Sequence, residues 1–394
     1  MSKTVYMDYA ATTYTKTEVL QEMLPYFTEY YGNPSSIYSI SRHTKTAIDK
    51  ARERVAKAIN GTRDEIYFTG SGSEADNWAL KGIAFANKHR GNHIITTSIE
   101  HHAILHACQY LERHGFEVTY LPVDEYGIIN LEDLKNAITD KTILVSIMFA
   151  NNEIGSIQPI KEIGTICREK RIFFHTDAVQ ALGNVNIDVK EMNIDLLSMA
   201  AHKIYGPKGV GALYIRKGIK IDNLVHGGGQ ERARRAGTEN VAGIVGFGKA
   251  VELATTNLEE HAARLITLRD KLINGLLDIP YTRLNGPQNE NRLPGNANVC
   301  FKFIEGESIL LSLDFEGICA SSGSACTSGS LDPSHVLLAI GLPHEIAHGS
   351  LRLSIGDGTT EEDVDYVLSV LPGIIQRLRD MSPLYDDFVK KGEK

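Results

Sequence analysis

The stretch DLLSMAAHKIYGPKGVGAL, residues 195–213, decides how we interpret the fold of this chain. An apolar run from Ile194 to Met199 predicts a buried strand that ends shortly before Lys203. A Gly-Pro turn follows, and a second apolar run, Val210–Ile215, predicts another strand. The sequence therefore places Lys203 at the end of a strand, beside a turn.

Lys203 has two interpretations at this point. A lysine beside a Gly-Pro turn is usually a solvated surface residue. A partly desolvated lysine instead loses its proton more easily and becomes a nucleophile that forms Schiff bases. The stretch alone leaves both open, and the test is whether the rest of the chain supplies partners for an aldehyde cofactor.

Predicted strands and helices alternate through the first half of the chain. The predicted strands are 65–69, 93–97, 117–123, 142–149 and 172–176. The predicted helices are 40–59, 74–89, 100–114, 131–138 and 159–168. This alternation predicts an α/β fold in which a mostly parallel sheet is covered by helices on both faces.

The order of elements changes after residue 279. Strands and helices there predict a smaller α+β domain, with strands at 297–303 and 350–354 and helices at 307–316, 333–340 and 360–378. We assign residues 15–260 to a large α/β domain, and residues 1–14 with 261–394 to the small one. We also expect an extended lead-in over 1–17, one long helical stretch from Val241 into the 270s, and fraying of the last dozen or so residues.

Composition and charge exclude several classes of protein. The 394 residues are 42% hydrophobic and 23% charged with a formal net charge of −8, so we expect no nucleic acid and no anionic membrane as partner. Because no apolar run follows a basic start, we expect neither a signal peptide nor a membrane span. The expected location is the cytoplasm.

The five cysteines are too few, and odd in number, for a disulfide framework. The sequence has no C-x-x-C pair, so it gives little support for a structural zinc or iron–sulfur site within one chain. Four cysteines lie among apolar residues and are predicted to be in the core: Cys108, Cys167, Cys300 and Cys319. Cys326 differs, because it lies in the Ser/Gly-rich segment SSGSACTSGS, residues 321–330.

Polar residues follow the ends of several predicted strands. A parallel sheet binds ligands beyond the carboxyl ends of its strands, so such residues lie close together. The residues that we expect at this edge are Ser73, His101, Asn151, Asn152, Asp177, Gln180 and Lys203.

The segment Gly70–Ala75 follows a predicted strand and opens a helix. It matches the dinucleotide fingerprint G-x-G-x-x-A, so a nicotinamide-dependent oxidoreductase is an alternative. Backbone N–H groups and the Ser73 hydroxyl at a helix N-terminus also suit a phosphate of any origin. The simplest interpretation is a capped helix start.

Three further residues are open to two interpretations each. Asp177 is either a helix cap or the partner of a protonated pyridine nitrogen. His101 is either structural or an imidazole that stacks on a cofactor ring and exchanges protons. His102 and His106 have the i,i+4 spacing of metal ligands, although no third ligand is evident. A lysine, an aspartate, phosphate donors and an imidazole at neighbouring strand ends together indicate a pyridoxal phosphate enzyme.

A series of motifs supports this interpretation. In chain order they are MDYAATT (7–13), YGNPSS (31–36), SGSEADN (71–77), EHHA (100–103), NNEIG (151–155), HTDAVQ (175–180), HKIYGPKG (202–209), GGGQERARRAGT (227–238) and SSGSACTS (321–328). The set resembles the cysteine desulfurases of the NifS/IscS type, which are class-V aminotransferases with the fold type I of pyridoxal phosphate enzymes. The resemblance runs from about Met7 to the segment 382–385.

The resemblance implies a homodimer whose large domain contains a mostly parallel seven-stranded sheet. Lys203 would bind pyridoxal 5'-phosphate as a Schiff base, and Asp177 would pair with the pyridine nitrogen. His101 would stack on the ring as acid and base, and Gln180 would bond the phenolic oxygen. The phosphate would be held by Gly72, Ser73, His202 and, from the other subunit, Thr238, while Asn152 and Ala200 would also lie at the cofactor.

The resemblance also implies the substrate and the reaction. Asn152 and Arg352 would hold the carboxylate of L-cysteine, a role that suits the guanidinium fork. Cys326, in a mobile loop of about 321–333, would take the sulfur as a persulfide and release L-alanine, with His101 or a positive field helping to form its thiolate. We expect no resident metal, although Cys326 could transiently ligate an iron–sulfur cluster with a scaffold partner.

Two departures from the family pattern concern the phosphate and the sulfur acceptor. Ala200 stands where relatives usually have a serine or threonine, so one phosphate donor is missing. The sequence ends at Lys394 without the longer tail that relatives use to dock a scaffold. The acceptor therefore stays open between iron–sulfur cluster assembly, a nitrogenase-linked scaffold and tRNA thiolation, and a sulfur carrier without turnover is the non-enzyme alternative.

Overall fold

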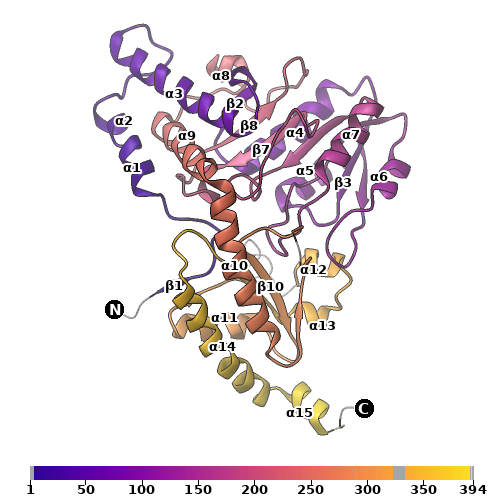
Figure 1. Ribbon diagram of the computed structural model, residues 1–394. Helices are drawn as coiled ribbons and strands as arrows, with labels where there is room; N and C mark the ends of the chain where they lie inside the picture. The colour runs from indigo at the N-terminus through magenta and orange to yellow at the C-terminus, as the bar shows by residue number, and fades with distance from the viewer. Residues whose placement is uncertain (1–3, 289, 323–332, 391, 393–394) are drawn as a thin grey trace.

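The structure, a computed structural model, describes residues 4–288, 290–322, 333–390 and 392 (Figure 1). Its large sheet is built from β2 (Ile66–Thr69), β3 (His93–Thr97), β4 (Glu117–Leu121), β5 (Thr142–Ser146), β6 (Phe173–Asp177), β7 (Leu196–Ala200) and β8 (Gly211–Ile215). The strand order is β2-β8-β7-β6-β5-β3-β4. All neighbours from β7 to β4 are parallel, whereas β8 is antiparallel to both β7 and β2. The predicted mostly parallel, seven-stranded sheet is confirmed.

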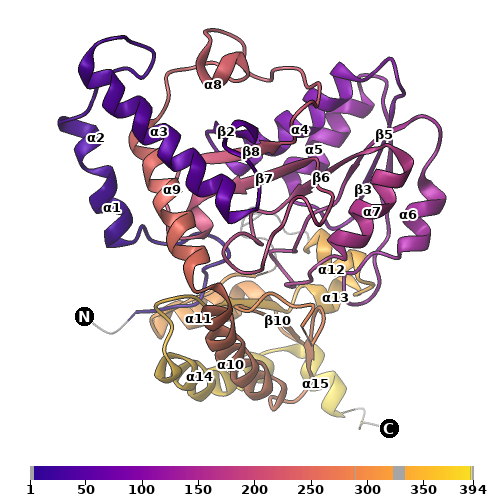
Figure 2. The same cartoon turned by 45° about the horizontal axis from the view of Figure 1, so that its top comes forward.

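Helices cover both faces of the large sheet (Figure 2). They are α3 (Ser39–Ala58), α4 (Gly72–Ala86), α5 (His102–Glu112), α6 (Leu131–Ala137), α7 (Ile160–Lys170) and α9 (Val241–Thr256). Successive strand side chains point to opposite faces, so Leu196 packs with α4 and α5 while Leu197 packs with α3, α7 and α9. Each buried leucine contributes about 1.5–3 kcal/mol, and the continuous apolar runs in the sequence reflect this burial on both faces.

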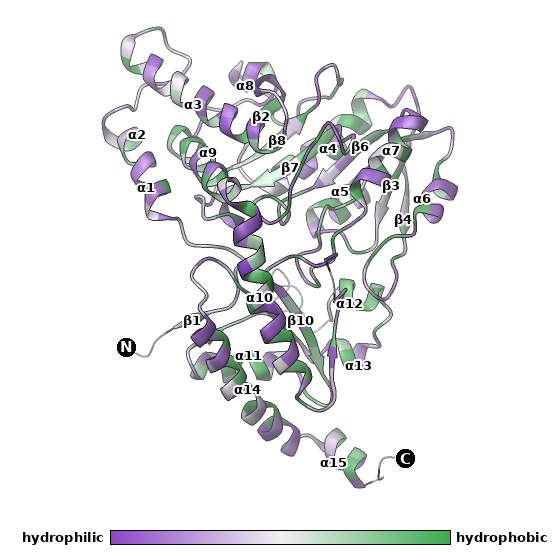
Figure 3. Ribbon diagram, viewed as in Figure 1, coloured by the Kyte–Doolittle hydropathy of each residue, from purple (hydrophilic) through white to green (hydrophobic). Residues whose placement is uncertain are grey.

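The smaller part of the molecule contains two short sheets. Its elements are β1 (Val5–Tyr6), β9 (Thr282–Leu284), β10 (Asn296–Phe301), β11 (Ile318–Cys319), β12 (Ser350–Ser354), α10 (Leu258–Leu277), α11 (Gly306–Phe315) and α14 (Glu361–Asp380). Strand β10 lies between β12 and β9 in an antiparallel sheet, and β1 is parallel to β11. Hydrophobic and hydrophilic residues alternate along α14 (Figure 3), as expected for a helix with one buried side.

The remaining elements are short. They are α1 (Thr17–Met23), α2 (Pro25–Thr28), α8 (Gln230–Ala233), α12 (His335–Ala339), α13 (His344–Ala347), α15 (Pro383–Lys390) and the 3-10 turns Arg63–Glu65 and Ala201–Lys203. None of the described helices has the length and apolar composition that crossing a bilayer requires.

Two expectations for the helices are wrong. The predicted long helical stretch is two helices, α9 and α10, because Asn257 leaves helical geometry at φ −128° and ψ 47°. The last residues are not frayed throughout, since α15 packs the rings of Tyr385 and Phe388 against Tyr281 and Phe303. The predicted domain boundary at residue 260 falls in the first turn of α10, which extends from the larger part into the smaller one in Figure 1.

The segment Met7–Thr13, named here the N-terminal segment, connects the two parts of the molecule. At one end, Ser354 on β12 donates its N–H to the carbonyl of Met7 at 2.7 Å. At the other end, Thr13 donates its N–H to the carbonyl of His202 at 2.9 Å. The predicted extended lead-in therefore crosses the carboxyl edge of the large sheet before α1 begins.

Candidate active site

A cavity of about 430 Å³ lies where β5, β6 and β7 end. The smaller part of the molecule contributes Arg352 and His335 to its wall. The predicted site residues that line it are Gly72, Ser73, His101, Asn152, Asp177, Gln180, Ala200, His202, Lys203 and Arg352. The structure brings these residues together at the edge expected for a parallel sheet, and their individual roles stay predictions.

Two predicted site residues are not part of this wall. Thr238 is exposed, beyond α8, and does not line the cavity. The segment before it is fixed by Arg52, whose two terminal nitrogens each lie 2.7 Å from a carboxylate oxygen of the buried Glu231. Cys326 lies outside the described residues.

Lys203 extends into the cavity from the turn that follows β7. Its Nζ donates to the carbonyl oxygens of Ala10 and Ala11, each at 2.7 Å. The amide of Gln180 donates to the same Ala10 carbonyl at 3.0 Å. The N-terminal segment thus holds the lysine amine beside Gln180, and the solvated-turn interpretation of Lys203 is wrong.

Three buried carboxyl groups also line the cavity: Asp76, Glu100 and Asp177. Burial raises the pKa of Asp177 to about 6, while the N–H of Val179 and the charge of Lys203 lower it. Burial raises the pKa of Glu100 to about 8, and burial together with the charge of Asp177 raises the pKa of Asp76 well above its usual range. At neutral pH Asp177 is therefore the ionised member, and the wall favours a cationic group beside it.

His101 is the N-cap of α5 and also lines the cavity. Its Nδ1 accepts the N–H of Ala103 at 3.1 Å, so the neutral ring has its proton on Nε2. Burial, and then the charge of Lys203, lower the pKa of His101 to about 4. The two sequence interpretations are therefore compatible, because one nitrogen caps the helix while the ring faces the cavity.

The start of α4 provides a cradle for a phosphate. Ser71 caps the helix by accepting the N–H of Glu74 at 3.1 Å. A Cβ on Gly72 would lie 2.8 Å from Val179 Cγ2, so glycine is the residue that fits at this position without a clash. His202 lies near, held by Thr12 Oγ1 at 3.1 Å, and its pKa is lowered to about 4 by burial and by Lys203.

These groups fit pyridoxal phosphate better than a dinucleotide. The cavity offers an amine, an ionised carboxylate for a ring nitrogen and a helix N-terminus for a phosphate, and Asp76 Oδ1 is buried without a hydrogen-bond partner among the described residues. The dinucleotide fingerprint requires a parallel βαβ unit. Strand β2 instead lies at the sheet edge and pairs antiparallel with β8, which contradicts the nicotinamide alternative.

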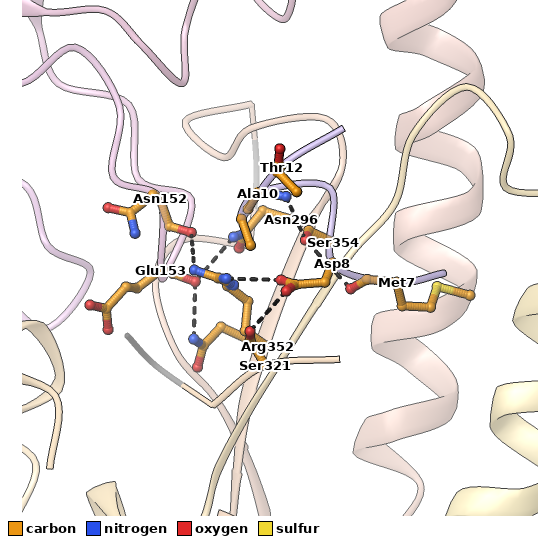
Figure 4. Close-up of polar contacts among 12 residues, drawn as sticks. Met7, Asp8, Ala10, Thr12, Asn152, Glu153, Asn296, Ser321, Arg352 and Ser354 are labelled. Atoms are coloured by element: carbon orange, nitrogen blue, oxygen red, sulfur yellow. Dashed lines mark hydrogen bonds and ion pairs between the residues drawn. The ribbon is translucent and has the colours of Figure 1, made fainter. Parts of the chain in front are cut away.

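Arg352 closes the cavity from the small part and is 1% exposed (Figure 4). Its Nη2 lies 2.9 Å from Asp8 Oδ1, and its Nη1 donates to the carbonyl oxygen of Asn152 at 3.3 Å. The other carboxylate oxygen of Asp8 accepts the hydroxyl of Ser321 at 3.0 Å. Sequence reasoning missed Asp8, although it stands in the MDYAATT motif.

A cluster of imidazoles adjoins the cavity. The ring of His102 lies 4.7 Å from that of His335 and 5.2 Å from that of His106, between centroids. His335 donates from Nε2 to the carbonyl of Glu100 at 2.9 Å. The described residues contain no group of three or more His, Cys, Asp or Glu side chains placed to hold a metal. Sequence reasoning missed Asp76, Glu100 and His335. Asp76 and Glu100 stand inside the motifs SGSEADN and EHHA, whereas His335 stands outside every motif.

Comparison with known proteins places the chain in a family. The family model described as Aminotransferase class-V matches residues 5–367. Cysteine desulfurase IscS of Clostridium botulinum (strain Hall) is 67% identical over 396 residues, covering 100% of both chains. A solved structure described as a NifS-like protein is 41% identical with a TM-score of 0.90, covering 95% of this chain and 100% of the other. The structure of SspA in complex with cysteine is 38% identical with a TM-score of 0.79, covering 89% and 99%.

The chain therefore belongs to the class-V aminotransferase family. Within that family it is a cysteine desulfurase of the NifS/IscS type, as the match over the whole chain shows. The resemblance that the sequence motifs indicated is confirmed.

Proposed function

We propose that this protein is a pyridoxal phosphate-dependent cysteine desulfurase that converts L-cysteine to L-alanine and transfers the sulfur to Cys326 as a persulfide. The observation that supports the proposal is the convergence of Lys203, Asp177 and Arg352 on one cavity. The sulfur then passes to an acceptor protein such as an iron–sulfur scaffold. The protein works in the cytoplasm.

The cofactor, when bound, supplies an aldehyde for the substrate amine and an electron-withdrawing ring that stabilises charge at Cα. Asp177, ionised at neutral pH, keeps a proton on the ring nitrogen. Gly72 and Ser73 at the start of α4, with His202, hold the phosphate. Ala200 offers no hydroxyl there, and its short side chain lies beside Gly72.

Residues of the chain bind the substrate and transfer protons. With the cofactor bound, the Lys203 amine would take the Cα proton of the substrate. Arg352 and Asn152 bind the substrate carboxylate, and His101, neutral with a proton on Nε2, exchanges protons beside the ring. The Cys326 thiolate attacks the substrate sulfur, the C–S bond breaks, and Cβ gains a proton. L-cysteine and a thiol thus give L-alanine and a persulfide.

The enzyme acts as a homodimer in this proposal. Thr238 is exposed and lies outside the cavity wall of its own chain, which agrees with a role in the cavity of the other subunit. Chain mixing tests this: Thr238→Ala chains and Lys203→Ala chains, each defective alone, regain about a quarter to a half of the activity in a mixed dimer. Activity that does not return in isolated mixed dimers contradicts the shared site.

The test of the reaction is L-alanine formation from L-cysteine, followed together with mass spectrometry of the protein. The wild type forms alanine, gains one sulfur atom on Cys326, and loses its cofactor colour on borohydride reduction. Cys326→Ser forms no persulfide and loses turnover. The matched control is Cys319→Ser. The prediction that Cys319 lies in the core is wrong, because it is partly exposed, and it does not line the cavity. Equal alanine formation by wild type and Cys326→Ser would show that Cys326 is not the nucleophile.

A further inference from the structure

The carboxylate of Asp8 lies between the guanidinium of Arg352 and the hydroxyl of Ser321 (Figure 4). Oδ1 lies 2.9 Å from Arg352 Nη2, and Oδ2 accepts from Ser321 Oγ at 3.0 Å. Ser321 is also joined to Arg352 through the backbone, because the two residues exchange N–H to carbonyl bonds of 2.6 and 3.2 Å. Asp8 and Ser321 therefore fix the arginine from two directions.

The N-terminal segment gives Asp8 little freedom to turn. The hydroxyl of Tyr6 lies 3.1 Å from the Asp8 carbonyl and 2.9 Å from the Thr12 carbonyl. On the other side, Ala10 donates its N–H to Ser354 Oγ at 2.9 Å. The backbone of Asp8 is thus held at both ends, and its carboxylate direction is set before any substrate binds.

This geometry orients the guanidinium in the cavity wall. A buried arginine needs a countercharge, because an uncompensated buried charge is strongly destabilising. Asp8 supplies that charge, and the Asn152 carbonyl holds the other terminal nitrogen at 3.3 Å. These two bonds, one on each terminal nitrogen, hold the plane of the guanidinium in place. A guanidinium held in this way binds a second carboxylate at a lower cost in conformational entropy, because its orientation is already fixed.

We propose that Asp8 is a positioning residue: it holds the guanidinium of Arg352 ready for a carboxylate and thereby makes the site select α-amino acids over amines that lack one. This inference rests on the proposed function, in which Arg352 binds the substrate carboxylate. Asp8 acts only through Arg352 and does not touch the substrate. Its loss therefore affects ligands with a carboxylate and spares those without.

The test is a spectral titration of the cofactor-loaded protein with L-alanine and with ethylamine, which differ by the carboxylate. In Asp8→Asn, which keeps the shape of the side chain, the Kd for L-alanine rises about tenfold, the order expected for one charge-assisted hydrogen bond. The Kd for ethylamine stays within about twofold, a change below the net contribution of a single hydrogen bond. The matched control is Asp357→Asn, because Asp357 forms ion pairs with Lys16 and His261 at the same junction without contacting Arg352.

Three outcomes overturn the inference: an equal rise for both ligands in Asp8→Asn, no rise for either, or the same selectivity change in Asp357→Asn. The first would mean that Asp8 only supports the fold, and thermal unfolding of the loaded variants would confirm that by a matching fall in Tm. Turnover gives an independent readout, since Asp8→Asn raises KM for L-cysteine while kcat changes by less than about threefold. A wild type that forms no alanine would instead contradict the proposed function.

Discussion

The carboxyl edge of the large sheet and the contact between the N-terminal segment and β12 build the same cavity in different ways. At the sheet edge, Asp177 ends β6 and Lys203 follows β7, so the strands themselves bring the two side chains to one edge, where the carbonyls of the N-terminal segment hold the lysine amine. At the second contact, Asp8 meets Arg352 across a separation of 344 residues. The strands of the sheet place the side chains of the first region, whereas the contact in the second region joins the two ends of the chain and forms only when the whole chain is folded.

The difference between the two regions also divides their tasks. The sheet edge presents an amine, a carboxylate and a helix N-terminus, which are groups that hold and activate a cofactor. The second region presents a guanidinium, which recognises a carboxylate. Substitutions at the sheet edge should therefore lower kcat or change cofactor binding, whereas substitutions at the second region should raise KM.

The largest effect belongs to Lys203→Ala at the sheet edge. We expect kcat to fall by about 10⁴-fold or more, because removal of an essential reacting group has effects of this size. The absorption band of the bound cofactor is lost as well, which spectrophotometry detects. Lys208→Ala is the control, since Lys208 lies in the same turn and donates to the Thr13 carbonyl at 2.7 Å. Retained activity in Lys203→Ala would show that the reaction does not depend on the lysine at the sheet edge.

In the second region, Arg352→Lys keeps the charge but loses the planar fork. We expect KM for L-cysteine to rise about 30-fold, in line with about 2 kcal/mol for a charge-assisted hydrogen-bonded pair, and kcat to change little. Steady-state kinetics measures both. Arg264→Lys is a suitable control because Arg264 donates to the backbone carbonyls of Gly356, Asp357 and Thr359, away from the cavity. A fall in kcat at constant KM would contradict the proposal that the second region binds the substrate while the sheet edge carries out the reaction.

Asp177→Asn should change the pH dependence of stability in the cofactor-free protein. Burial raises the pKa of Asp177 from 3.8 to about 6, so the folded protein holds this proton more tightly and wild-type stability is lost as pH rises from about 4 to about 6. Asparagine does not ionise, so above pH 6 the variant is more stable by on the order of 3 kcal/mol, and below pH 4 the difference disappears. Denaturant unfolding at pH 4, 6 and 8 measures it.

Asp188→Asn provides a control of opposite sign. Burial alone would raise the pKa of Asp188, but the N–H of Glu191 and the amide of Asn60 lower it overall. Its charge therefore stabilises the fold above its usual pKa, and the asparagine variant is less stable than the wild type at neutral pH. If Asp177→Asn is also less stable than the wild type at pH 8, the ionised carboxylate of Asp177 does not destabilise the cofactor-free protein, and this prediction is wrong.

The smallest effect is expected for Ser321→Ala. It removes the hydroxyl that bonds Asp8 at 3.0 Å but leaves the contact between Asp8 and Arg352. KM for L-cysteine should rise about threefold, the lower range for one hydrogen bond. Ser312→Ala on α11 is the control, since its hydroxyl donates to the Ser308 carbonyl of the same helix at 2.8 Å. A rise in KM larger than that in Asp8→Asn would show that Ser321, and not Asp8, is the main residue that positions Arg352.

Much of the sheet edge was predictable because its signals are local. The period of apolar residues located every strand of the large sheet, and the parallel-sheet rule gathered the polar strand ends at one site. Asp76 and Glu100 escaped notice because a carboxyl group in a helix or before one has no pattern that distinguishes a buried from a solvated position. Their burial follows only from the packing of α4 and α5 on the sheet.

The second region was not predictable from pattern for a related reason. Nothing in MDYAATT indicates that Asp8 meets an arginine in the last strand of the chain, since that contact depends on the pairing of β1 with β11 and of β10 with β12. The helix α15 was missed for the same reason, because the aromatic residues that it packs against lie about a hundred positions earlier. Tertiary contacts of this range decide both cases.

The long separation between Asp8 and Arg352 has a consequence for biosynthesis. With residues added at about 5–20 per second, the ribosome takes on the order of tens of seconds to deliver the arginine after the aspartate has emerged. All strands of the large sheet are complete once Ile215 has been made. In the proposed function, the nascent chain can therefore complete the edge that faces the cofactor well before Arg352 is made, so the proposed selection of α-amino acids is acquired late in synthesis.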